Sequence, residues 1–180
     1  RAKILDFIKS YDMVNEISAT RSMAKIRVNS EPVTITGYTV NDSNYFKIRD
    51  IAMLLRNTSA KFNVSWNSSL EAIMIETDTD YVAVGGELSG EIDQDMNVIE
   101  NSTPIYVDGR QTAITAYNIN GSSYFKIRDI SDAAGFDIQW DGDSQTINII
   151  TTFKISKKNI KELINIVMII VPIFKKIQVL

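Results

Sequence analysis

The feature that most constrains this chain is an internal repeat that covers most of its length. Residues 26–51 read IRVNSEPVTITGYTVNDSNYFKIRDI and align without gaps with residues 105–130, which read IYVDGRQTAITAYNINGSSYFKIRDI. The seven letters YFKIRDI end both segments unchanged, and further along the chain Trp66 aligns with Trp140. Repetition of this length indicates that one structural unit is present twice, although two copies are too few for a solenoid.

Each copy is predicted to form three strands, one helix and two further strands. In copy one, alternating apolar residues predict strands at 24–29 and 33–40, with a bulge at Gly37 where the apolar phase shifts. A short strand at 45–47 comes next, and from Ile48 onward the apolar spacing becomes helical. Two alternating strands then predict a closing hairpin at the end of each copy.

Turn and helix-end signals support these elements. Asn120-Gly121 is a favoured two-residue hairpin turn because both residues tolerate positive φ. Asp50 and Asp129 fall in the first helical turn, where the positive end of the helix dipole stabilises a carboxylate. Gly135 is placed to end the second helix.

The repeat divides the chain into five parts. Residues 24–77 and 103–151 are the two copies, and residues 78–102 are predicted to be a linker. Residues 1–23 have the spacing of an amphipathic helix, which either ends a lost upstream domain or docks on copy one; residues 152–180 form an apolar and basic tail. The predicted fold class is α+β: two tandem β-β-β-α-β-β repeats, each a small twisted antiparallel sheet packed around one helix, with helical extensions at both ends.

The tail contains a short apolar run, Leu163–Phe174, that raises the question of membrane contact. As a helix this run would measure about 18 Å, whereas the hydrocarbon core of a bilayer is about 30 Å thick. Three readings stay open: an interfacial or partner-docking helix, an altered or poorly ordered tail, and, less favoured, a full span. Pro172 would bend or end any helix there.

The composition excludes several classes of chemistry. The chain has no His and no Cys, which removes Ser-His-Asp and Cys-His catalysis, disulfides and thiolate metal sites. Its net charge is −3 and no basic stripe is visible in the repeats, so a nucleic-acid partner is not expected. We therefore predict a protein that is not an enzyme and has no catalytic, cofactor-binding or metal-binding residues.

Two kinds of side chain are nevertheless candidates for a ligand site. The aromatic candidates for a glycan platform are Tyr38, Trp66, Tyr117 and Trp140, although core packing in a small domain is the favoured interpretation. The charged candidates are Lys47, Arg49 and Asp50 with their equivalents Lys126, Arg128 and Asp129. A helix start with a surface ion pair accounts for these charges without any ligand.

Acidic residues are spaced closely in two places, and both are candidates for calcium binding. The residues are Glu87, Glu91, Asp93 and Asp95 in the linker, and Asp141 and Asp143 in copy two. Neither group has the twelve-residue loop of an EF-hand, and solvated turns are the favoured interpretation.

The repeats resemble the copper amine oxidase N-terminal domain, also called the stalk domain. The resemblance is carried by AYNINGSSYFKIRDISDAAGFDIQWD in copy two, GYTVNDSNYFKIRDIAMLLRNTSAKFNVSW in copy one, and the linker segment YVAVGGELSG. It implies a five-stranded antiparallel sheet around a helix, used as a tandem accessory module of secreted or wall-associated bacterial proteins. It does not imply oxidase chemistry, since the histidine copper ligands are lacking and Asn44-Tyr45 is followed by Phe46 in place of an acid.

The expected function is therefore a non-catalytic stalk, spacer or wall-contacting module, located outside the bacterial cell. The alternative is a module that binds cell-wall glycan or peptide through exposed aromatic residues. The expected partners are neighbouring domains of a larger protein and cell-wall material. The chain begins at Arg1 and shows no signal peptide, so it is interpreted as a fragment or a processed product.

Overall fold

The same order of elements occurs twice in the computed structural model, which describes residues 17–89, 95–151 and 168. Copy one consists of β1 (Ile17–Arg21), β2 (Lys25–Val28), β3 (Glu31–Val33), β4 (Gly37–Val40), β5 (Ser43–Lys47), α2 (Ile48–Leu55), β6 (Phe62–Asn67) and β7 (Ala72–Thr77). Copy two consists of β8 (Met96–Glu100), β9 (Ile105–Val107), β10 (Arg110–Gln111), β11 (Ala116–Ile119), β12 (Ser122–Lys126), α3 (Ile127–Ala134), β13 (Asp137–Asp141) and β14 (Thr146–Ile150).

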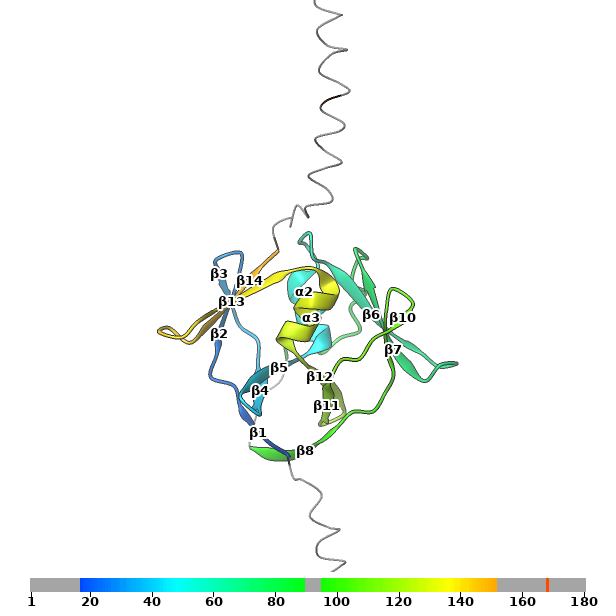
Figure 1. Cartoon of the computed structure of the whole chain (residues 1–180), viewed down its shortest axis with the longest axis horizontal. Coiled ribbons are helices and arrows are strands. Elements are labelled where there is room, and N and C mark those ends of the chain that lie inside the picture. Colours follow the sequence, from blue (N-terminus) through cyan, green and yellow to red (C-terminus); the bar gives the residue numbers. More distant parts are fainter. Residues whose placement is uncertain (1–16, 90–94, 152–167, 169–180) are drawn as a thin grey trace, which may run out of the picture.

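Three strands from each copy close into one antiparallel barrel, in the order β1-β4-β5-β12-β11-β8 (Figure 1). Where the copies meet, equivalent residues face each other. Phe46 on β5 is paired with Phe125 on β12, and Ser18 on β1 is paired with Asn97 on β8. These two pairings place an approximate two-fold axis through the barrel, and closure leaves none of its strands with an open edge.

The remaining strands form two mixed sheets, and each sheet takes strands from both copies. One has the order β10-β9-β7-β6 and the other β13-β14-β2-β3. In each sheet, the last strand of one copy pairs in parallel with the second strand of the other copy: β7 with β9, and β14 with β2. The helices α2 and α3 lie between these two sheets, with the barrel at one end of the body (Figure 1).

A pair of equivalent side-chain contacts fastens the ends of these shared sheets. The side chain of Asn29 accepts a hydrogen bond from the backbone N–H of Thr151 (2.9 Å) and donates one to its hydroxyl (2.8 Å). At the equivalent place Asp108 accepts bonds from the backbone N–H (2.9 Å) and hydroxyl (2.7 Å) of Thr77. The turn after the second strand of each copy is thus hydrogen-bonded to the end of the last strand of the other copy.

The apolar interior has two parts, which lie on opposite faces of the barrel strands. Four tyrosines fill the barrel and meet edge to face in two pairs, Tyr38 with Tyr124 and Tyr45 with Tyr117. Burial raises the pKa of Tyr45 and of Tyr124 to about 12, so both hydroxyls stay protonated at neutral pH. The second core contains Phe46 and the apolar faces of both helices and both mixed sheets.

The predicted fold class is wrong, although most of its elements are present. The chain is mainly β, with a closed six-stranded barrel, and neither copy wraps a sheet of its own around its helix. The local apolar pattern located the strands but carried no information on which copy would supply each partner strand. Because the two copies are so similar, a strand of one fits beside the other equally well.

Three boundaries also differ from the prediction. The expected strand 33–40 is two strands in different sheets, β3 and β4, so the change of apolar phase at Gly37 marks a crossing and not a bulge. The expected helical extension 1–23 includes strand β1, while residues 1–16 lie outside the described ranges. The expected linker 78–102 includes β8, the equivalent of β1.

Several local predictions are confirmed. The helices begin at Ile48 and Ile127, and Gly135 ends the second in the left-handed conformation (φ 76°). The turn at Asn120 and Gly121 has positive φ at both residues, and the closing hairpins form as expected.

Candidate ligand-binding pockets

Two pockets lie at equivalent places in the repeat, one beside each tryptophan. We call them the Trp66 pocket, with a volume of about 380 Å³, and the Trp140 pocket, with about 340 Å³. Every residue that lines the Trp140 pocket has its repeat equivalent in the lining of the Trp66 pocket. The two-fold arrangement has therefore built the same concave site twice.

Each pocket is assembled from both copies. The Trp66 pocket takes its tryptophan and the start of α2 from copy one, and the turn residue Gly121 with the start of β12 from copy two. The Trp140 pocket combines the start of α3 with the turn residue Asp42 and the start of β5 from copy one. Neither pocket could therefore be recognised from one copy alone. The only sign of these pockets in the sequence is that YFKIRDI and the tryptophan after it both occur twice.

The four aromatic candidates separate into two kinds. Tyr38 and Tyr117 are buried inside the barrel and cannot meet a ligand. Trp66 is 54% exposed and Trp140 is 51% exposed. Large aromatic side chains are usually well buried, so two equivalent tryptophans that line cavities with half their surface open are the strongest indication of a binding surface in the described residues.

The four cations among the charged candidates line the same pockets, whereas Asp50 and Asp129 line neither. Lys47 and Arg49 line the Trp66 pocket, and Lys126 and Arg128 line the Trp140 pocket. Of these four cations only Lys47 forms an ion pair within the described residues, with Asp50 at 3.5 Å. Both pockets therefore present positive charge that the protein does not fully balance, in a chain whose net charge is negative.

The pocket walls are fixed by one equivalent hydrogen bond in each half. The Ser22 hydroxyl donates to the side-chain oxygen of Asn44 (2.6 Å), and the side-chain nitrogen of Asn101 donates to the hydroxyl of Ser123 (3.1 Å). Ser22 and Asn101 are repeat equivalents, as are Asn44 and Ser123, so the two partners have exchanged residue types while the contact is retained. These two hydrogen bonds hold the starts of β5 and β12 at the mouths of the pockets.

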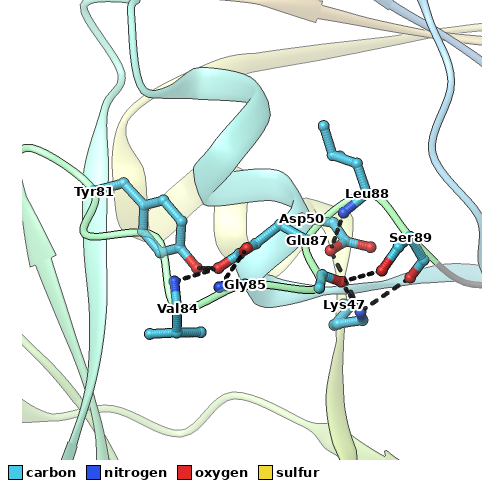
Figure 2. Close-up of polar contacts among 9 residues, drawn as sticks. Lys47, Asp50, Tyr81, Val84, Gly85, Glu87, Leu88 and Ser89 are labelled. Atoms are coloured by element: carbon cyan, nitrogen blue, oxygen red, sulfur yellow. Dashed lines mark hydrogen bonds and ion pairs between the residues drawn. The ribbon is translucent and has the colours of Figure 1, made fainter.

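The segment 81–89, which we call the covering loop, lies over the start of α2 and is anchored by Glu87 (Figure 2). The Glu87 carboxylate accepts hydrogen bonds from the Tyr81 hydroxyl (2.7 Å) and from the backbone N–H groups of Val84 (2.8 Å) and Gly85 (3.0 Å). Lys47 donates to the Gly86 carbonyl at 3.2 Å, which ties a pocket cation to the loop.

Asp50 joins the same network from the helix side (Figure 2). Asp50 is only 2% exposed, and its carboxylate accepts a hydrogen bond from the backbone N–H of Leu88 (2.9 Å). Burial raises its pKa, an effect that the Leu88 hydrogen bond and the charge of Lys47 oppose. Asp129 is only half-buried, so the sequence located both carboxylates in the first helical turn but missed that one of them fastens the covering loop.

Acid is expected to release the covering loop at an unusually low pH. Hydrogen bonds, chiefly from Val84 and then Tyr81, lower the pKa of Glu87 from 4.5 to about 2. The folded state thus binds this proton more weakly than the unfolded chain, so the contribution to stability is complete above pH 4.5 and is lost as the pH falls toward 2. NMR titration of the Val84 and Gly85 amide shifts should give a midpoint near 2, and Glu87→Gln should remove the titration. A midpoint near 4.5 would contradict the anchoring role.

The acidic candidates for calcium binding do not gather in the part of the chain that the structure describes. No group of three Asp or Glu side chains there is placed to hold a metal ion. Asp141 accepts hydrogen bonds from the backbone N–H groups of Asp143 (3.0 Å) and Ser144 (3.3 Å) in a turn. Glu91 and Asp93 lie outside the described residues.

Little of the apolar tail falls within the described residues, where only Met168 represents it. No helix in the described ranges is both long and apolar enough to cross a membrane. The three readings of the tail given above stay predictions.

Comparison with known proteins gives no match: no family model, no curated protein and no solved structure matches this chain. The resemblance of the repeats to the stalk domain therefore stays a prediction from the sequence.

Proposed function

We propose that this chain is a non-catalytic accessory module of a bacterial extracellular or wall-associated protein, and that it binds a saccharide of the cell wall. The observation that carries the binding function is the pair of equivalent pockets, each with a half-exposed tryptophan. The negative face of an indole ring attracts the C–H groups on the apolar face of a sugar ring. The polar turn at the mouth of each pocket supplies partners for the sugar hydroxyls.

The lining of the pockets favours binding over catalysis. No carboxylate lines the Trp66 pocket, and Asp42 is the one carboxylate of the Trp140 pocket. Glycoside hydrolysis by carboxylates generally needs two of them on either side of the scissile bond. The accessory role and the extracellular location rest on the resemblance of the repeats to the stalk domain, with neighbouring domains and wall material as the partners.

The proposal predicts that retention on purified bacterial wall material depends on both tryptophans. Trp66→Ala and Trp140→Ala should each weaken retention about tenfold, since aromatic anchors in pockets carry much of the binding energy, and the double variant should abolish it. Because both side chains are half-exposed, the variants should stay folded. Met23→Ala, at an exposed residue that lines neither pocket, is the matched control and should bind normally.

The same experiment separates binding from a pure spacer role. If the unaltered chain is not retained, or if the double tryptophan variant is retained as well as the control, the pockets are not the binding site. A spacer function would then be the remaining form of the accessory role.

A further inference from the structure

The two pockets differ in one charge at the same structural position. The second residue of the copy-one hairpin turn is Asp42, which lines the Trp140 pocket. Its repeat equivalent is Gly121, which lines the Trp66 pocket. Asp42 places a carboxylate among the cations of its pocket, whereas the lining of the Trp66 pocket contains Lys47 and Arg49 and no acidic residue.

Within the Trp66 pocket Lys47 is paired with Asp50, so Arg49 carries the positive charge that the described residues do not balance. Arg49 forms no ion pair in the described ranges, and its Nη1 atom is buried without a hydrogen-bond partner. A guanidinium in this state is stabilised by any carboxylate that enters its surroundings, because charge-assisted hydrogen bonds strengthen as water is excluded. Lys47 lines the same pocket and donates hydrogen bonds to the Gly86 and Ser89 carbonyls of the covering loop, which position it before a ligand arrives.

We propose that the Trp66 pocket selects an acidic saccharide, with a sugar ring against the indole and its carboxylate beside Arg49 and Lys47, whereas the Trp140 pocket does not discriminate in favour of acid. This inference rests on the proposed saccharide-binding function and adds the ligand class of each pocket. The extra polar residues of the Trp66 pocket, Asn101 and Asn118 among them, provide further contacts for an acidic sugar.

The turn position allows the charge to be moved without disturbing the fold. Gly121 has φ +76°, and a Cβ atom added there would meet nothing within 4 Å. Asp42 already occupies the equivalent position with φ 57°, so this chain shows that aspartate fits the turn. Gly121→Asp and Asp42→Gly are therefore a matched pair that exchanges the two local sequences.

Each pocket can be monitored separately because the chain has only two tryptophans. Trp140→Phe leaves Trp66 as the sole indole fluorophore, and Trp66→Phe leaves Trp140. Each single-tryptophan protein is titrated with an oligomer of galacturonic acid and with a neutral N-acetylglucosamine oligomer of the same length. The titrations are repeated at high salt, which should weaken only a charge-dependent contact.

The Trp66 reporter should bind the acidic oligomer at least about tenfold more tightly than the neutral one, as one charge-assisted contact would give. Gly121→Asp should remove that preference, and Asp42→Gly should create a similar preference at the Trp140 reporter. Equal affinity of the Trp66 reporter for both oligomers, or an unchanged preference in a folded Gly121→Asp protein, would overturn the inference while saccharide binding stands. Absence of binding by any oligomer at both reporters would overturn the proposed function and the inference together.

Discussion

Cutting the chain between its two copies should leave one stable complex and not two independent domains. A protease recognition sequence placed within residues 90–94 allows the cut to be made in the folded protein. The resulting fragments should elute together as one species under native conditions and separate only in denaturant. The reason is that the barrel and both mixed sheets take strands from each side of the cut.

The melting temperature of the cut protein tests this prediction quantitatively. Association of two fragments makes the melting temperature rise with protein concentration, whereas unfolding of the uncut chain is independent of it. The uncut protein that carries the same insertion is the control. Fragments that separate on a sizing column while each keeps its native spectrum would show that the copies fold independently, and would contradict the shared sheets.

Truncation of either phenylalanine on the two-fold axis should be the most damaging single change in the core. Phe46 is 1% exposed and Phe125 is 0% exposed, and their positions are paired across β5 and β12. Phe46→Ala and Phe125→Ala should each reduce the free energy of unfolding by about 3–5 kcal/mol, through lost burial and the cavity left behind. Urea denaturation monitored by circular dichroism measures this directly.

The pairing of Phe46 with Phe125 across the two-fold axis makes the test more specific. The two variants should cost nearly the same, and their costs should not add, because the paired positions share one part of the core. Met23→Ala, at a residue that is 75% exposed, should change stability by less than about 0.5 kcal/mol. A cost below about 1 kcal/mol for either phenylalanine would contradict its burial in the shared core.

The sequence predicted elements well where the signal is local. The helix starts at Ile48 and Ile127 follow a change of apolar spacing within a few residues, and the turn at Gly121 follows from backbone preference alone. Strand β1 was missed because Ile17 also fits the helical spacing of the residues before it, and the alternation in ISATR is limited to Ile17 and Ala19. Strand partners were mispredicted because each closing strand meets a nearly identical opening edge in either copy.

The exposure of the tryptophans shows the limit of alternation as a guide to burial. Phe62, Val64 and Trp66 lie on one face of β6, and the first two are buried in the core. Alternation therefore placed Trp66 on the correct face but could not show that the core ends before it. The cavity begins at that point, because the other wall is formed more than fifty residues away, by Gly121 and the start of β12.

The parallel pairing of β2 with β14 has a mechanical consequence for a unit placed between two other parts of a protein. The chain enters through β1, close to the N-terminal end of β2, and leaves from the C-terminal end of β14. For parallel neighbours these two ends are opposite, so tension on the chain pulls the strands past each other lengthwise. The hydrogen bonds between them, with the Asn29–Thr151 contact at the exit, then bear the load together and must break together, which is a property suited to a connector under tension.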